Sequence, residues 1–189
     1  MWSLRCFAAL AVAGVTLAGC ATPLEVSQVT DIRSKTSSND IDVLAVKRAQ
    51  TGSGVPEYAG NQLAEVRAYE RIDSKGDVEM AGVSCHLSTP HYEADLVTPA
   101  KVRVPLYRGK SSELAVSCKR QGYISRLVTV RAIDVTRAQR LNSGANSGLL
   151  GLAVVAVIDA ASDNTKNDWK YPPVKVLLER VPNRRANAS

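Results

Sequence analysis

The residues most able to do chemistry are two histidines, His86 and His91, followed closely by the carboxylates of Glu93 and Asp95. Imidazole and carboxylate groups in such proximity could share a zinc ion. However, residues 87–90 read Leu-Ser-Thr-Pro, which is typical of a loop, and neither an HExxH pattern nor a paired Cys-x-x-Cys is present. We therefore expect no metal site and no cofactor.

Patterns that mark common enzymes are also missing from the sequence. Residues 51–54 read Thr-Gly-Ser-Gly but lack the lysine and the following helix that a phosphate-binding loop needs. Neither a nucleophile elbow nor a dinucleotide-binding fingerprint occurs. We therefore predict that the protein is not an enzyme and that its role is structural or binding.

The N-terminus has the layout of a secretory signal. Arg5 supplies a positive charge, and residues 7–17 form an uncharged, mostly apolar run. A charged start followed by 7–15 apolar residues is typical of a signal peptide. The run is shorter than the roughly 20 residues that a membrane-spanning helix requires. We therefore predict that residues 1–19 are a cleaved signal.

Directly after that run, Leu17-Ala18-Gly19-Cys20 resembles the lipobox of bacterial lipoproteins. The resemblance implies that Cys20 is lipidated and becomes the first residue of the mature chain. Two or more acyl chains make such an attachment stable. Ala21 in the following position implies the outer membrane, with the protein facing the periplasm. The alternative is an ordinary cleaved signal with an incidental cysteine.

With Cys6 lost in the signal and Cys20 lipidated, two cysteines remain, Cys85 and Cys118. In an oxidising compartment such a pair more often forms a disulfide than a metal site. Both cysteines fall on apolar strand faces, which is where a bridge between two sheets would lie. We expect that disulfide, and two buried free thiols remain the alternative.

The length and composition fit one folded domain. The chain has 189 residues, of which 45% are hydrophobic and 22% charged, so a disordered acidic chain and a polytopic membrane protein are excluded. We predict a polar tether over residues 20–40, an edge strand over 41–46 and a glycine-rich loop over 51–60. Residues 62–72 fit either a helix or a strand, and the turn over 73–77 favours the strand.

Alternation of apolar and polar residues dominates the middle of the chain. Period-two alternation between glycine-containing turns indicates an antiparallel sheet with one buried face. The fold class we predict is mainly β (α+β), an antiparallel β-sandwich. The residues that alternate on the apolar faces are Val83, Cys85, Leu87, Val102, Val104, Leu106, Leu114, Val116, Cys118, Val128, Val130 and Ala132.

Part of this block contains Thr98-Pro99-Ala100 with Val102 and Val104, then Leu114, Val116 and Cys118, and finally Gly122-Tyr123. With these residues it resembles the PEGA-like β-sandwich modules of bacterial envelope proteins. The resemblance covers residues 78–133 and implies a structural or binding role for a lipoprotein of unknown function.

Residues 143–158 form a glycine-punctuated apolar segment, with Gly144, Gly148 and Gly151. We predict an apolar helix over about 144–161, lying across the sheet. The alternatives are a buried strand and a membrane-dipping or self-associating segment, because small residues spaced by four allow close helix approach. The last alternative would make the protein a membrane-active or self-assembling lipoprotein.

The C-terminal part of the chain completes the expected domain. Residues 174–178 fit a closing strand, and we predict that the whole domain covers residues 41–182. Residues 183–189 are expected to form a disordered tail.

The net charge of +6 is unevenly distributed. Residues 101–140 carry ten basic and two acidic side chains, whereas residues 20–100 carry seven basic and twelve acidic ones. A basic face could attract an anionic envelope component. The alternative is a solvated face neutralised by the acidic N-terminal half. Because of the envelope address we expect no nucleic-acid partner, and instead a membrane reached through the lipid and an envelope component or protein.

Overall fold

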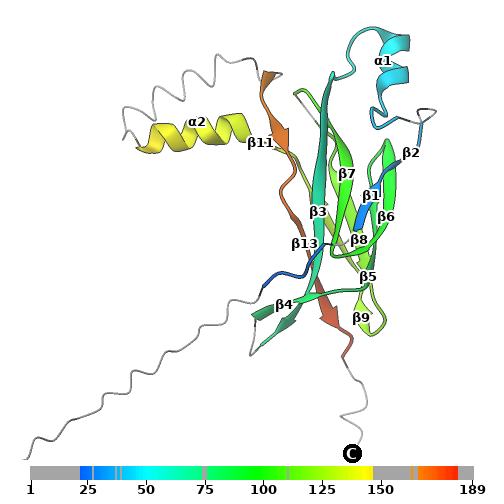
Figure 1. Ribbon diagram of the computed structural model, residues 1–189, viewed down its shortest axis with the longest axis vertical. Coiled ribbons are helices and arrows are strands. Elements are labelled where there is room, and N and C mark those ends of the chain that lie inside the picture. The colour runs from blue at the N-terminus through cyan, green and yellow to red at the C-terminus, as the bar shows by residue number, and fades with distance from the viewer. Residues whose placement is uncertain are drawn as a thin grey trace, which may run out of the picture.

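The computed structural model describes residues 22–26, 28–36, 38, 40–73, 76–109, 111–146, 163 and 166–182. Two β-sheets dominate this part of the chain, which confirms the mainly β fold class (Figure 1). Sheet A has the order β1-β7-β3-β13-β9, with β4 also beside β3, and sheet B has the order β10-β8-β5-β6-β2. β11 and β12 form a third sheet of two strands.

The strands are β1 (Gln28–Asp31), β2 (Arg33–Ser34), β3 (Tyr58–Ile72), β4 (Gly76–Met80), β5 (Val83–Ser88), β6 (Tyr92–Thr98), β7 (Ala100–Tyr107), β8 (Leu114–Lys119), β9 (Tyr123–Ile124), β10 (Arg126–Val130), β11 (Ile133–Asp134), β12 (Trp169–Lys170) and β13 (Val174–Arg180). The helices are α1 (Ala45–Thr51) and α2 (Val135–Asn146). None of the described helices is long and apolar enough to cross a bilayer.

At two places the chain crosses from one sheet to the other and so closes the sandwich along its sides. β1 pairs with β7 in sheet A and β2, one residue later, pairs with β6 in sheet B. β9 pairs with β13 in sheet A and β10, again one residue later, pairs with β8 in sheet B. Strands that switch sheets form the corners of such sandwiches. The two sheets are therefore joined at both sides and enclose one core.

Alternation places that core as the sequence predicts. The residues expected on the apolar faces of β5 and β8 point inward and are almost fully buried, as are Val102 and Val104 of β7. The prediction fails at the end of β7, where Leu106 is only partly buried and its neighbour Pro105 is buried instead. In β10, Val128 and Val130 are partly buried against the core. Residues 62–72 lie within β3, so the strand prediction is confirmed, with Ala64, Val66 and Ala68 turned inward. The closing strand is also confirmed, as β13.

The sheets are mixed rather than purely antiparallel. β13 runs parallel to β3 and β1 runs parallel to β7, whereas the remaining pairs are antiparallel. Several other strands separate β1 from β7 and β3 from β13 in the chain. The chain can therefore come back and run in the same direction as the earlier strand. The antiparallel part of the prediction is wrong for these two pairs.

The prediction of a tether over residues 20–40 is wrong from Gln28 onward, because β1 and β2 belong to the sandwich. These strands are held by backbone pairing at the sheet edges and have mostly exposed side chains. Their attachment therefore leaves no apolar alternation in the sequence. The described part of the lead is residues 22–26.

The edge strand predicted over residues 41–46 is also wrong. A turn occupies this region and α1 begins at Ala45. Val43 and Leu44 are buried in the core cluster, beneath α1 at one end of the sandwich (Figure 1). Asp42 holds this end in place by accepting hydrogen bonds from Arg48 (2.8 Å) and from the Tyr107 hydroxyl (3.2 Å).

The apolar helix predicted over 144–161 overlaps α2 only at residues 144–146, the last three residues of α2. Residues 147–162 lie outside the described residues, as do the predicted signal, Cys20 and the predicted tail over 183–189. α2 itself begins at Val135, nine residues before the predicted helix.

Candidate functional site

Cys85 and Cys118 form a disulfide, as expected, but its place differs from the prediction. The two cysteines face each other on β5 and β8, neighbouring antiparallel strands of sheet B, with their Cα atoms 4.1 Å apart. The bridge therefore joins strands within one sheet, not two sheets. This close spacing matches the narrow pairs of an antiparallel ladder, in which side chains lie closest. Both sulfurs are on the core face, so the bridge lies under the sheet.

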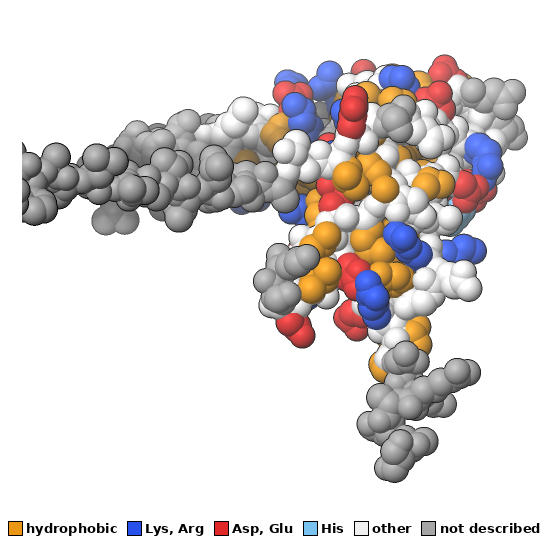
Figure 2. Space-filling view, turned by 60° about the horizontal axis from the view of Figure 1, so that its bottom comes forward, with side chains coloured by type: hydrophobic (Ala, Val, Ile, Leu, Met, Phe, Trp, Pro, Cys, Tyr) orange, Lys and Arg blue, Asp and Glu red, His pale blue; other side chains and the backbone are white. Residues whose placement is uncertain are grey.

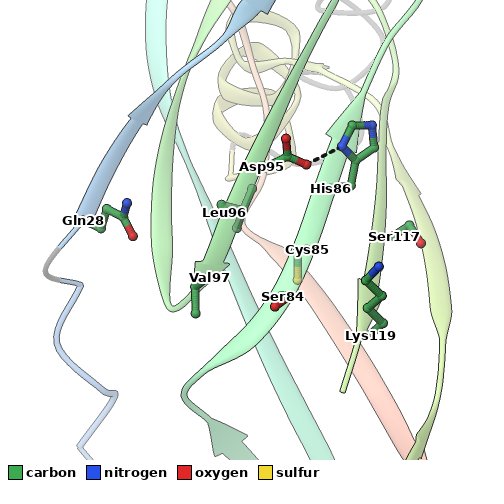
Figure 3. A pocket seen from close by; sticks show the side chains of 9 residues that line it. All are labelled: Gln28, Ser84, Cys85, His86, Asp95, Leu96, Val97, Ser117 and Lys119. Atoms are coloured by element: carbon green, nitrogen blue, oxygen red, sulfur yellow. Dashed lines mark hydrogen bonds and ion pairs between the residues drawn. The ribbon is translucent and has the colours of Figure 1, made fainter. Parts of the chain in front are cut away.

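On the opposite, outward face of the same strands lies a shallow hollow of about 480 Å³ (Figure 3). The residues that line it come from β5, β6 and β8, with one from β1. They are Gln28, Ser84, Cys85, His86, Asp95, Leu96, Val97, Ser117 and Lys119. Its outward side chains are mostly polar, and Val97, 46% exposed, is an apolar exception.

Strand register arranges these side chains in two rows. His86 on β5 lies opposite Asp95 on β6 and Ser117 on β8. Ser84 on β5 lies opposite Val97 and Lys119 in the same way. Directly opposed side chains have Cβ atoms about 5 Å apart. We call these six residues, Ser84, His86, Asp95, Val97, Ser117 and Lys119, the sheet B grid.

The charged end of the grid is neutralised by its neighbours. His86 Nδ1 lies 2.7 Å from Asp95 Oδ1, and Arg33 Nη2 donates to Asp95 Oδ2 at 2.6 Å. The hydrogen bonds from His86 and from Arg33 hold the pKa of Asp95 below its ordinary value. All three groups are largely exposed, so these ion pairs add little to folding stability. Their effect is to orient the imidazole.

That orientation determines what His86 can do. With Nδ1–H donated to a carboxylate, the neutral ring presents Nε2 as an acceptor, on the side away from Asp95 (Figure 3). Ser117 shares the row with His86 and Asp95, an order found in hydroxyl–imidazole–carboxylate catalytic sites. In this structure Ser117 Oγ and His86 are not hydrogen-bonded to each other, and the row is open to solvent. The arrangement fits hydrogen bonding to a bound molecule better than nucleophilic attack.

The positive end of the grid is Lys119. No carboxylate of the described residues lies within ion-pairing distance of its ammonium group. Lys119 and the hydroxyl of Ser84, directly opposite, together present a cation and a donor. An anionic group with neighbouring hydroxyls matches this chemistry.

Several other basic side chains of residues 101–140 are paired. Arg103 pairs with Asp31, Arg108 with Glu57, Arg126 with Glu179 and Arg131 with Glu113. Blue and red side chains are accordingly interspersed over the face seen in Figure 2. The excess of positive charge in this segment thus does not form a single basic face there. Three of the four acidic partners come from outside the segment.

The two histidines are not brought together. His91 lies at the α1 end beside Leu44 and Tyr107, where burial and the charge of Lys47 lower its pKa. Glu93 pairs with Arg33 and Lys35 instead of joining either histidine. Within the described ranges, no group of three or more histidine, cysteine, aspartate or glutamate side chains is placed to hold a metal ion.

Arg33, Ser84 and Ser117 were not among the expected functional residues, and Lys119 was expected only as one of the ten basic side chains of residues 101–140. Ser84, Ser117 and Lys119 are the polar members of the alternation in β5 and β8. The signal was therefore present in the sequence, but only the pairing of β5 with β8 brings these residues together. Arg33 had no such signal, because β2 lies in the expected tether. Comparisons with protein-family models, with curated proteins and with solved structures found no match.

Proposed function

We propose that this protein is a lipid-anchored envelope protein, attached through Cys20 to the outer membrane and facing the periplasm, with a binding role and no catalytic one. The observation that carries the proposal is the Cys85–Cys118 disulfide. Disulfides form and persist outside the reducing cytosol. The sequence Leu17-Ala18-Gly19-Cys20 would direct the chain to such an oxidising compartment.

The anchor is tested by metabolic labelling with a radioactive fatty acid and by the intact mass of the purified mature protein. We expect label on the wild type and a mass corresponding to acylated Cys20 followed by Ala21. Cys20→Ser should abolish the label. Cys6→Ser is the matched control, because this cysteine lies in the predicted signal, and it should leave the label unchanged. An unlabelled wild type, or a mature chain beginning elsewhere, would contradict the anchor.

For the binding role, the sheet B grid supports an anionic component of the cell envelope as the ligand. Lys119 supplies the charge, and Ser84 and Ser117 supply hydroxyls on the same outward face. The hollow is wide and open, which fits a segment of a polymer or glycolipid headgroup better than a small enclosed molecule.

Cosedimentation with purified cell-wall sacculi, and separately with lipopolysaccharide, tests this role. Lys119→Ala should weaken binding by about tenfold or more, since a charge-assisted contact is worth about 1.5–3 kcal/mol and about 1.4 kcal/mol corresponds to a factor of ten. Lys170→Ala is the matched control: the same change at an exposed lysine of β12, outside sheets A and B, should leave binding unchanged. Equal loss in both variants would indicate nonspecific attraction and would contradict the grid as the binding site.

A further inference from the structure

The segment that precedes β1, residues 22–26, is fastened to the outer face of sheet A. The amide of Leu24 donates to Glu79 Oε2 at 2.9 Å, and Arg67 Nη1 donates to the carbonyl of Leu24 at 2.9 Å. Both backbone groups of one residue are thus held by side chains of the sheet. We call residues 22–26 together with Arg67 and Glu79 the N-terminal clip.

The receiving side of the clip is already ordered by its own interactions. Arg67 also pairs with Glu79 and with Glu65, and the side chains of Arg67 and Glu79 are only 13% and 11% exposed. Glu79 stands opposite Tyr69 in the β3–β4 pairing, on the outward face of the sheet. Hydrogen bonds to charged groups such as these are roughly twice as strong as bonds between neutral groups. The segment reaches the sheet in its lower part, near β4 (Figure 1).

The clip shortens the lead between the fold and Cys20. Four residue steps separate Leu24 from Cys20, which span at most about 14 Å when fully extended. Without the clip, the first fastened residue would be Gln28 in β1, and the eight steps to Cys20 would reach about 28 Å. The tether expected over residues 20–40 would have reached about 70 Å.

We infer that the N-terminal clip holds the outer face of sheet A against phospholipid headgroups, an inference that rests on the proposed attachment through Cys20. A lead of this length leaves the β3–β4 part of sheet A as the part of the fold nearest to the bilayer. Tyr69 and Lys175 lie beside the clip, with the lysine ammonium 5.6 Å from the tyrosine ring centre. Amphipathic side chains of these two types favour the boundary between water and lipid.

The sheet B grid lies on the other side of the sandwich from the clip. The two sheets of a sandwich are about 10 Å apart, and the grid lies on the far side of sheet B. The clip therefore turns the proposed binding surface away from the membrane that anchors the protein. One face is used for attachment, and the other is left free for a ligand.

Energy transfer to the bilayer tests this orientation in the full-length lipidated protein. A single tryptophan is introduced in a Trp169→Phe background, either by Tyr69→Trp beside the clip or by Val97→Trp in the grid. The proteins are reconstituted in phosphatidylethanolamine–phosphatidylglycerol vesicles that contain a dansyl-headgroup lipid. Because the sheets are about 10 Å apart, we expect transfer from position 69 to exceed that from position 97 by about twofold or more. Equal or reversed transfer would overturn the inference.

Removing the clip should abolish the difference. Glu79→Ala, added to the Tyr69→Trp protein, should lower its transfer toward that from position 97. Asp77→Ala is the matched control: it removes a carboxylate on the same strand and face, but one that pairs with Arg71 instead of the lead. An unchanged signal in Glu79→Ala would overturn the clip. Failure of every variant to float with the vesicles would instead overturn the lipid anchor, and the orientation with it.

Discussion

Replacing both Cys85 and Cys118 by alanine tests the structural role of the disulfide most directly. The bridge links residues separated by 33 positions. Closing a loop of that size in the unfolded chain is worth about 4 kcal/mol by the chain-entropy relation. Cys118 is fully buried and Cys85 is 5% exposed, so each truncation also leaves a small void worth about 1 kcal/mol. We therefore expect the free energy of unfolding to fall by about 5–6 kcal/mol, a large part of the 5–15 kcal/mol typical of a domain.

The assay is urea unfolding followed by circular dichroism, with and without reductant. The slope of free energy against urea should rise in the double alanine variant, because its unfolded chain is no longer cross-linked and exposes more surface. Reduced wild type should be less stable than oxidised wild type by the loop term alone, and the variant should not respond to reductant. A variant within about 1 kcal/mol of oxidised wild type would refute the loop-closure reasoning. It would show that strand pairing alone holds β5 against β8.

Three further predictions concern the sandwich itself. Val102→Ala, at a fully buried position of β7, should lower the free energy of unfolding by about 2–3 kcal/mol in the same urea assay. The side chain of Gln62 bonds both the amide and the carbonyl of Tyr171, each at 2.8 Å; in Gln62→Ala, hydrogen exchange at the Tyr171 amide should therefore accelerate, whereas an unchanged rate would contradict this bridge. Although partial burial acts to raise the pKa of Asp42, its hydrogen bonds with Arg48 and the charge of Arg48 outweigh that effect and hold the pKa below its ordinary value. Asp42 thus contributes stability that is fully present above about pH 4 and is lost as the pH falls through its folded-state pKa, so urea midpoints measured from pH 7 to pH 2 should fall less steeply in Asp42→Asn than in wild type.

Alternation in the sequence was enough to place most of the core. In β5, β7 and β8 the apolar residues repeat every second position, and burial of one sheet face requires that period. The ambiguous residues 62–72 were assigned correctly because the following turn, where β4 begins at the positive-φ residue Gly76, favours a hairpin. The pairing of Cys85 with Cys118 also followed from the sequence, since Cys20, the other cysteine of the predicted mature chain, was expected to be lipidated.

Two kinds of feature could not be predicted from alternation: strands held at the edge of a sheet, and contacts between residues far apart in the sequence. β1 and β2 are held through backbone groups, which every residue carries, so their polar composition indicated a tether. Within residues 41–46, only Val43 and Leu44 are buried over the end of the sandwich, and α1 begins at Ala45. Asp42 holds this turn through Arg48 and Tyr107, which the local sequence pattern does not show. The parallel course of β13 along β3 arises from contacts between residues more than 100 positions apart.

The two faces with proposed roles, the sheet B grid and the outer face of sheet A at the clip, also depend partly on the sequence and partly on the tertiary structure. The sequence alone determined the residue types, namely a cysteine after an apolar leader and polar residues alternating with buried ones. Only the tertiary structure decided that Ser84, His86 and Lys119 share one outward face, and that Leu24 is held by Arg67 and Glu79 on the other sheet. Alternation specifies whether a side chain points in or out, but strand order and register determine its neighbours, and these are set by packing of the whole chain.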